Sequence, residues 1–519
     1  MSFLTHLCKP ASRRILFNGR SQYFNTRLSQ QDTIFALSTA QGKAGIAVIR
    51  VSGLKASDAL ISLAPKDLKK PLPTPRKATK RIIVHPTTGE MLDHGLVLWF
   101  PGPNSYTGQD VAEFHIHGGI SVISGVLDAL GSVEGFRHAE QGEFTRRAFD
   151  NDKLDLTEIE GLADLLNAET EAQRRQALRQ AQGSLKNLYE SWRKQLIENI
   201  ALIEAVIDFS EDENIEDGVF EQGKSFLINI YHGTNYSQII LIAVANVKQV
   251  LNMMINHVND NRRGEILRDG IHVTLFGPPN VGKSSFLNCL AQRQAVIVSS
   301  IPGTTRDIIE ISLNIGGYPI IIGDTAGLRQ SNDIIEIEGI KRAKDRILLA
   351  DIKMCILSSI EVLKSLNSND ENSFRIINPL INESLDKSTF LILNKSDLLN
   401  ESELAYLKKA IAKIFPENYI CYVSCINGDG IKEFLDIFVS SLKHKYDNSA
   451  TQVALITQPR HRENLNDCIY GLQSFLAQKD IVLAAEELRY ATNALGRITG
   501  NVEVDEVLNV IFERFCIGK

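Results

Sequence analysis

Hydrophobic residues recur at spacings of three and four along the middle and the end of this chain, a pattern typical of amphipathic helices. In the middle tract the repeating positions are Leu185, Leu188, Trp192, Leu196, Ile200 and Ile203. No proline occurs between Asn104 and Gly277 or after Pro459, where "AAEELRYATNAL" and "VDEVLNVIFERF" continue the pattern. We therefore predict one discontinuous helical domain, made of residues 151–269 and 455–519.

The chain ahead of the helical tract has a different pattern. Short β-rich runs such as "GIAVIRVSG" and "HGLVLWFPGP" lie between glycine and proline residues, and the helical run "VISGVLDAL" comes later. This mixture predicts a compact α+β domain over residues 32–150.

Residues 270–450 alternate apolar runs of strand length with helical stretches. The strand-like runs are "IHVTLFG", "YPIIIGD", "IKMCILS" and "TFLILNKSD". Strands that alternate with helices form a mostly parallel sheet with crossover helices, so we predict an α/β domain inserted into the helical domain. The polar stretch at residues 358–386 is expected to be an irregular surface excursion.

Basic residues are concentrated at the start of the chain. The first 31 residues contain five Lys or Arg, no Asp or Glu, and several serines. This composition is typical of a mitochondrial transit peptide, which we predict for residues 1–31, and a disordered tail is the alternative. The whole chain has a net charge of −6, so the remainder is acidic and RNA contact would need a local basic patch or a partner.

Cysteine usage and apolar runs argue against three further classes. The seven cysteines are odd in number and form no CxxC pair, which argues against a disulfide framework or a zinc site and fits a reducing compartment. The apolar run Ile239–Val247 is far shorter than the roughly 20 residues that cross a bilayer, so no membrane span is predicted.

A phosphate-binding loop is predicted at the start of the α/β domain. The segment "GPPNVGKSS", Gly277–Ser285, follows the strand "HVTLF" and opens the helix "SSFLNCLA". In this context the glycines let backbone N–H groups face phosphate oxygens, Lys283 supplies positive charge and Ser284 can bind Mg²⁺.

Three further motifs follow in the order expected of a GTPase. "PGTTRD" supplies Thr305 as a switch hydroxyl, and "DTAG" places the Asp324 carboxylate at a strand end, near the magnesium shell. Asp397 of "NKSD" can accept from the two N–H donors of guanine, which adenine does not supply, so we predict GTP. The predicted GTP-binding residues are Asn280, Val281, Gly282, Lys283, Ser284, Ser285, Ser299, Thr304, Thr305, Asp324, Thr325, Ala326, Gly327, Asn394, Lys395, Asp397, Ser424 and Cys425.

The residue after "DTAG" departs from the Ras-like pattern, in which a glutamine orients the attacking water. Leu328 stands there and cannot do so. Asp333, Glu336 and Glu338 are the carboxylates within reach of the same switch. An arginine finger would have to come from elsewhere or be replaced by a cation.

Taken together, these segments resemble the MnmE or TrmE family of tRNA wobble-uridine-modifying GTPases, in a mitochondrial form. The resemblance runs from Asp32 to Lys519 and rests on "DTIFALSTAQGKAGIAVIRVSG", "PNSYTGQDVAEFHIHGG", "GEFTRRAFDNDKLDLTEIEGLADLL", the GTPase motifs and the terminal "FCIGK". Residues 223–259 and 358–386 look longer than the family pattern.

The resemblance implies that the N-terminal domain dimerises and binds 5-formyl- or 5,10-methylene-tetrahydrofolate. The matching positions are Arg50, Glu113, Lys153 and Lys519. Arg50 or a lysine suits the carboxylate tail of folate, whereas Glu113 can pair with the donor edge of the pterin. Cys516 would lie near the one-carbon chemistry, as a nucleophile or a positioning group, if the last helix buries one face and holds the tail.

For the G domain, the resemblance implies that K⁺ replaces the arginine finger. Its matching ligands are Asn280, Ser299, Ile301 and Thr304, and Mg²⁺ would be bound by Ser284 and Thr305. Glu336 matches the water-orienting carboxylate of the family; without the resemblance it is a solvated charge at a helix start.

The implied reaction forms 5-carboxymethylaminomethyluridine, or its taurine analogue, at the wobble position of tRNA in the mitochondrial matrix. GTP hydrolysis would drive it in a homodimer working with an FAD-dependent MnmG/GidA-type protein, as a heterotetramer. The main alternative is an Era-like GTPase of mitochondrial ribosome assembly, although no basic RNA-binding module follows the G domain. A scaffold with a vestigial site is opposed by the intact Lys283, Ser284, Thr305 and Asp324.

Overall fold

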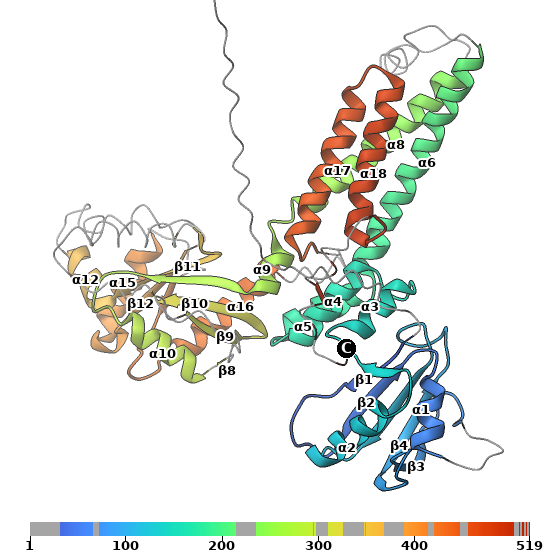
Figure 1. The fold of residues 1–519 in the computed structure, drawn as a ribbon. Helices are drawn as coiled ribbons and strands as arrows, with labels where there is room; N and C mark the ends of the chain where they lie inside the picture. Colours follow the sequence, from blue (N-terminus) through green and yellow to red (C-terminus); the bar gives the residue numbers. More distant parts are fainter. Residues whose placement is uncertain are drawn as a thin grey trace, which may run out of the picture. The chain divides into compact units, whose positions relative to one another are not determined.

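The computed structural model describes residues 32–65, 72–213, 235–293, 295–296, 310–324, 347, 349–367, 389–413, 420–446, 455–502, 508, 511–512, 515 and 518 (Figure 1). The chain divides into two compact units, residues 1–153 with 516–519, and residues 154–515. The last four residues therefore group with the N-terminal unit, although the pattern of the sequence assigned them to the helical domain.

The N-terminal unit is built on a six-stranded sheet with the order β3-β4-β5-β2-β1-β6. Its elements are β1 Thr33–Leu37, β2 Ala47–Ser52, α1 Ala56–Leu63, β3 Thr79–Val84, β4 Met91–Phe100, β5 Val111–Ile116, α2 Ile120–Gly131, β6 Phe136–His138 and α3 Glu143–Asp150. All neighbouring strands are antiparallel except β1 and β6. The structure therefore has the predicted α+β fold.

The two faces of this sheet differ. On one face, strand residues such as Ile49 and Phe114 form a hydrophobic core with Leu60 of α1 and Leu130 of α2. On the opposite face, Phe144 of α3 packs on Ile34 and Ala36 of β1. Because strand residues alternate between faces, Arg50, Glu113 and His115 share this second face.

The chain terminus docks on the N-terminal unit. The Ser38 hydroxyl donates to the Gly518 carbonyl over 2.9 Å. Gly518 has φ of +99°, and a Cβ atom there would lie 2.0 Å from the carbonyl oxygen of Leu37. Only glycine fits this approach, so the glycine of "CIGK" is needed where the tail meets β1.

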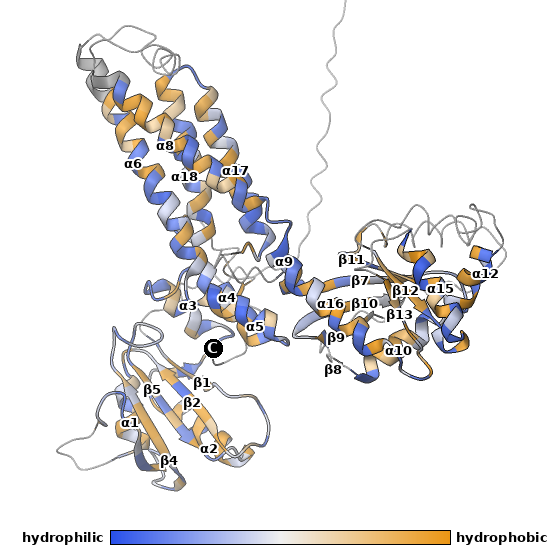
Figure 2. Cartoon of the chain, turned by 180° about the vertical axis from the view of Figure 1, so that it is seen from behind, coloured by the Kyte–Doolittle hydropathy of each residue, from blue (hydrophilic) through white to orange (hydrophobic). Residues whose placement is uncertain are grey.

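In the part of the chain that the structure describes, the helical domain consists of three short helices and a bundle of four long ones. Its helices are α4 Leu156–Asn167, α5 Glu171–Ala181, α6 Ser184–Glu213, α8 Asn235–Val258, α9 Arg263–Asp269, α17 Pro459–Ala477 and α18 Ile481–Thr499. One hydrophobic core joins α6, α8, α17 and α18 and includes Leu196, Val247, Leu472 and Leu488. Apolar and polar patches alternate along these helices (Figure 2), as expected for helices with one buried side.

Helix α8 falls in the segment that departs from the family pattern. The helical stretch Gln238–Asp269 is long and apolar enough to cross a membrane by length and composition, unlike the shorter run considered above. Within it, Ile240, Val244 and Val250 belong to the bundle core. The core helix of a water-soluble bundle meets the same criterion, so the absence of a membrane span stays a prediction.

The G domain has a seven-stranded sheet with the order β13-β12-β11-β7-β10-β9-β8. Its elements are β7 Ile271–Phe276, α10 Lys283–Arg293, β8 Ala295–Val296, β9 Glu310–Ile315, β10 Tyr318–Asp324, β11 Ile352–Ser358, α12 Ser359–Asn367, β12 Phe390–Asn394, the 3₁₀ helix η2 Ser396–Leu398, α15 Glu401–Ala412, β13 Ile420–Tyr422 and α16 Ile431–Tyr446. Strands β7, β10, β11, β12 and β13 run parallel. Helices α10 and α16 cover one face and α12 and α15 the other, which confirms the predicted inserted α/β domain.

The predicted irregular excursion is wrong over its first part. Ser358 ends β11, and residues 359–367 form α12, whose Val362 and Leu363 are buried. The helical spacing of these apolar residues was obscured by the polar run that follows them. Residues 368–388 lie outside the described part of the chain.

Candidate functional site

The P-loop connects β7 to α10 and lies against the neighbouring strands. Gly277 has φ of +149°, and a Cβ atom there would lie 2.1 Å from the Ile356 carbonyl oxygen of β11. Gly282 has φ of +98°, and its Cβ would lie 2.2 Å from the Asn394 side chain at the end of β12. The two glycines are therefore required by backbone conformation and by space.

The polar groups of the loop gather at the start of α10. The Lys283 ammonium donates to the carbonyls of Gly277 and Pro278, at 2.9 and 2.8 Å. Ser284 and Ser285 are exposed in the first turn of the helix. Backbone N–H groups in a first turn have no acceptor within the helix, so this end favours an anion.

The base-recognition motif is tied to the P-loop by side-chain hydrogen bonds. The Asn394 amide donates to the Val281 carbonyl over 2.8 Å, and its oxygen accepts from the Cys425 N–H over 3.3 Å. The Lys395 ammonium donates to the Asn280 carbonyl over 2.7 Å. These contacts bring the predicted residues of three separate loops into one site at the carboxyl edge of the parallel sheet.

One oxygen of Asp397 is the strongest sign of the ligand. Its Oδ1 atom is buried and has no hydrogen-bond partner within the described part of the chain. A buried carboxylate oxygen without a donor is costly. The N1–H and N2–H groups of guanine are donors of the kind that this atom lacks, so the residues present fit a guanine nucleotide.

The last loop of the site is held by its own backbone. The Ser424 N–H donates to the Asp429 carbonyl over 2.9 Å, and the Ser424 hydroxyl accepts from the Asn427 N–H over 3.2 Å. Burial, with the nearby Cys289 and Asp397, raises the pKa of the Cys425 thiol to about 12. Cys425 therefore contributes its N–H group to Asn394, and its thiol is not a nucleophile at neutral pH.

Other predicted residues cannot be placed in this site. Asp324 ends β10 beside Leu275 of β7, as predicted, but only its backbone is described. The residues outside the described part of the chain are Ser299, Ile301, Thr304, Thr305, Thr325, Ala326, Gly327, Glu336, Cys516 and Lys519, together with the transit segment 1–31. Among the residues that the structure describes, no group of three His, Cys, Asp or Glu is arranged to hold a metal ion.

Two of the predicted folate residues meet on the second face of the N-terminal sheet. Arg50 of β2 pairs with Glu113 of β5, with Nε and Nη2 3.1 and 3.0 Å from Oε1. The Arg50 guanidinium lies 5.2 Å from the ring centre of Tyr106 and 5.8 Å from that of Phe144. On the other side of the carboxylate, His115 Nε2 lies 3.3 Å from Glu113 Oε2.

This pairing argues against one of the two predicted ways of holding the folate tail, in which Arg50 rather than a lysine holds the tail while Glu113 holds the pterin. The pterin ring and the glutamate tail are at opposite ends of an extended molecule, and side chains in direct contact cannot hold both ends. If Arg50 and Glu113 bind a folate while they remain paired, they contact the same end of it.

Lys153 reaches the same part of the N-terminal unit. A Cβ atom on Gly108 would lie 3.4 Å from its Cε atom, so the lysine stem packs on the loop that also carries Tyr106. The Lys153 N–H donates to the Ala148 carbonyl over 2.8 Å, at the end of α3. The structure thus brings three of the four predicted folate residues to this loop and the strands beside it.

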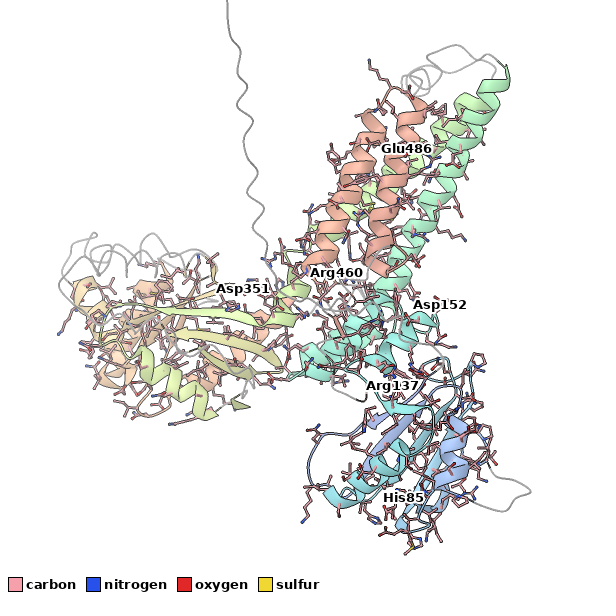
Figure 3. The ribbon with its side chains drawn as sticks, viewed as in Figure 1. His85, Arg137, Asp152, Asp351, Arg460 and Glu486 are labelled. Carbon is pink, nitrogen blue, oxygen red and sulfur yellow. The ribbon has the colours of Figure 1, made fainter. Side chains whose placement is uncertain are left out.

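The helical domain contains a buried charge cluster that was not predicted from the sequence. Glu160 of α4 is 4% exposed and accepts from Arg460 Nε at 2.6 Å and His461 Nε2 at 2.7 Å. Arg460, labelled in Figure 3, also donates to the Arg497 and Ile498 carbonyls at the end of α18. Glu160 occupies a core-facing position of an otherwise apolar helix stripe, and that was the signal in the sequence.

The pKa values in this cluster reflect strong coupling. Burial alone would raise the pKa of Glu160, but the charges and hydrogen bonds of His461 and Arg460 lower it to about 2. Burial lowers the pKa of His461, against the attraction of Glu160. Nearby, burial lowers the pKa of His257 to about 4, and its Nε2 lies 3.1 Å from the Tyr189 hydroxyl.

Two models of protein families match this chain. A family model described as "MnmE helical domain" matches residues 156–516, and one described as "GTP-binding protein TrmE N-terminus" matches residues 33–153. Together they account for the N-terminal unit, the helical domain and the G domain inserted in it.

Three curated proteins illustrate the similarity. The "5-taurinomethyluridine-[tRNA] synthase subunit GTPB3, mitochondrial" of Danio rerio is 46% identical over 495 residues, covering 94% of this chain and 93% of that protein. The "tRNA modification GTPase gtpbp3, mitochondrial" of Dictyostelium discoideum is 43% identical, covering 94% and 95%. The "tRNA modification GTPase MnmE" of Paramagnetospirillum magneticum is 43% identical, covering 94% and 100%.

Proposed function

This chain belongs to the MnmE/TrmE family of tRNA modification GTPases, and from that premise we propose that it supplies the GTP-driven step in forming 5-taurinomethyluridine at the tRNA wobble position. It is a mitochondrial member of the family, like the relatives from Danio rerio and Dictyostelium discoideum. The taurine product is favoured over 5-carboxymethylaminomethyluridine because the name of the Danio rerio relative specifies it.

The buried oxygen of Asp397 is the observation that carries the nucleotide assignment. Asn394 holds the base loop against the P-loop, so the guanine and phosphate ends of the site are kept at a set spacing. The Lys283 ammonium and the first turn of α10 supply positive charge where the phosphates would bind. Asn394, Asp397 and the P-loop therefore act as one GTP receptor.

Two cations would complete the site. Ser284, exposed at the start of α10, would bind Mg²⁺ together with Thr305. K⁺ would be bound by the exposed Asn280 side chain with Ser299, Ile301 and Thr304, and would supply the positive charge that an arginine finger supplies elsewhere. Glu336 would orient the attacking water in place of the glutamine that Leu328 replaces.

The N-terminal unit would bind tetrahydrofolate through Arg50, Glu113, Lys153 and Lys519. The docked Gly518 supports a place for the tail, and with it Cys516, in the same unit as Arg50 and Glu113. The second sheet face leaves Ile82 and Leu96 48% and 44% exposed, which suits a homodimer contact. An FAD-dependent MnmG/GidA-type partner would carry the redox chemistry in a heterotetramer.

The decisive experiment is analysis of the wobble nucleosides of mitochondrial tRNA from cells that lack this gene. Loss of 5-taurinomethyluridine supports the proposal, and an unchanged nucleoside profile overturns it. Loss of a carboxymethylaminomethyl product would correct the added group from taurine to glycine. With purified protein, GTP hydrolysis should be faster in KCl than in NaCl, and equal rates would remove K⁺ from the mechanism.

A further inference from the structure

The second face of the N-terminal sheet carries a polar row inside an apolar surround. Glu113 and His115 lie two residues apart on β5, so their side chains share one face. Across the sheet, Arg50 of β2 stands opposite Glu113, whereas Val48 of β2 and Leu96 of β4 stand opposite His115. The imidazole therefore lies between apolar neighbours, with the Glu113 carboxylate beside it.

Protein donors already occupy most of the acceptor positions of Glu113. A carboxylate has about four lone-pair positions. Two N–H groups of Arg50 approach Oε1, and His115 Nε2 approaches Oε2. Because a carboxylate can only accept, Nε2 of His115 must carry a proton in this contact. Counting the contacts of the described residues, one acceptor position on Oε2 remains for a ligand, and its direction depends on His115.

Next to that acceptor atom, Arg50 has N–H donors that do not face Glu113. A guanidinium has five N–H donors, of which two face Glu113. The stack on Tyr106 and Phe144 limits how the guanidinium can turn. The pair therefore presents donors next to a single acceptor. A pterin ring has the complementary edge, in which the O4 carbonyl is adjacent to the N3–H group.

We infer that Arg50, Glu113 and His115 form one receptor for the pterin edge, in which His115 is a positioning residue that holds Glu113 in its accepting orientation. This inference rests on the proposed folate function of the N-terminal unit and adds His115 to it. The glutamate tail of the folate then binds elsewhere, and Lys153, whose stem packs on the loop that carries Tyr106, is the candidate cation for it.

Binding of 5-formyltetrahydrofolate to the full-length protein tests the role of His115. The amide nitrogen of glutamine can replace Nε2 of histidine as a donor, whereas leucine cannot donate. His115→Leu should weaken binding about five- to tenfold, the loss expected for a hydrogen bond to a charged group that is partly exposed. His115→Gln should restore most of the affinity, and thermal melting should show that both variants fold.

His85 provides the matched control. It lies in the turn after β3, where its Nδ1 accepts from the Thr87 N–H, and it is labelled in Figure 3 at the end of the sheet away from Arg137. His85→Gln should leave folate affinity unchanged.

Two results would overturn the inference, and a third separates it from the proposed function. Wild-type affinity in His115→Leu would show that Glu113 needs no support, and equal losses in the Leu and Gln variants would exclude a hydrogen-bonding role. If Glu113→Gln abolishes binding while His115→Leu binds normally, the folate site stands and only the role of His115 fails. If the wild-type protein does not bind the folate, the proposed function of the unit fails as well.

Discussion

The buried Glu160 cluster allows a sharp prediction about the helical domain. Glu160→Gln keeps the size of the side chain but removes its charge. The variant leaves Arg460 with only the carbonyls of Arg497 and Ile498 as acceptors among its described contacts, and leaves His461 without its carboxylate. Because all of these groups are buried or nearly so, water cannot replace the lost charge.

The expected cost follows from the pKa of Glu160. The carboxyl falls from an ordinary value of 4.5 to about 2 in the folded protein. At 1.36 kcal/mol per pKa unit the shift corresponds to about 3 kcal/mol, the range in which breaking a buried ion pair usually falls. Because the pKa of His461 is lowered, Arg460 supplies the positive charge at neutral pH and His461 supplies a hydrogen bond. A lowered folded-state pKa stabilises above the unfolded value, so this contribution should be present above pH 4.5 and disappear as the pH falls towards 2.

Tryptophan fluorescence can follow the helical domain alone. The chain has two tryptophans, and Trp192 lies in the core of the bundle, so Trp99→Phe leaves one reporter there. Urea unfolding of Glu160→Gln in this background should show a loss of about 3 kcal/mol at pH 7 that shrinks on acidification. Glu171→Gln, whose carboxylate is half exposed beside Arg174, should show no measurable change. Equal stability of Glu160→Gln and its parent at pH 7, or a difference as large near pH 2 as at pH 7, would refute the reasoning.

Three further predictions concern the two ligand sites. Gly277→Ala would place a methyl group 2.1 Å from the Ile356 carbonyl, so titration with a fluorescent GTP analogue should show at least about tenfold weaker binding, with folate binding unchanged. Asp397→Asn should lower affinity for GTP by about 10–100-fold and raise that for xanthosine triphosphate, because the amide can donate to the xanthine O2; unchanged selectivity in competition binding would remove Asp397 from base recognition. Arg50→Gln should weaken the binding of tetrahydrofolate and of its pteroate analogue, which lacks the glutamate tail, by the same factor. A loss of affinity for the folate alone would show that Arg50 binds the glutamate tail.

Much of the nucleotide site was predictable because its residues belong to short motifs whose local backbone conformation the sequence determines. Gly277, Gly282 and Lys283 belong to one short loop between a strand and a helix, and such a loop has few alternative conformations once both ends are set. Asn394 and Asp397 follow directly from the strand that precedes them. Gly277 directly follows β7 and Asn394 ends β12, and the Asn394 amide is hydrogen-bonded to Val281 of the P-loop.

Other residues could not be predicted because their partners are far away in sequence. His115 was unremarkable until β2 and β4 were paired beside it, and Glu160 until α17, 300 residues later, brought Arg460 to it. The expectation that residues 358–386 are irregular failed for the opposite reason, since average polarity concealed a short helical pattern at its start.

The sequence by itself determined the fold classes (an α+β sheet domain, a helical domain and a P-loop G domain), the guanine-nucleotide motifs and the family, because strand and helix periodicity and short loop motifs are encoded by neighbouring residues. Only the tertiary structure decided that Arg50 and Glu113 pair, that His115 lies in contact with Glu113, and that Gly518 brings the end of the chain to β1. Hydrogen bonds require contact within about 3 Å, and the positions that meet across a sheet or at a docked terminus depend on strand pairing, which local sequence does not specify.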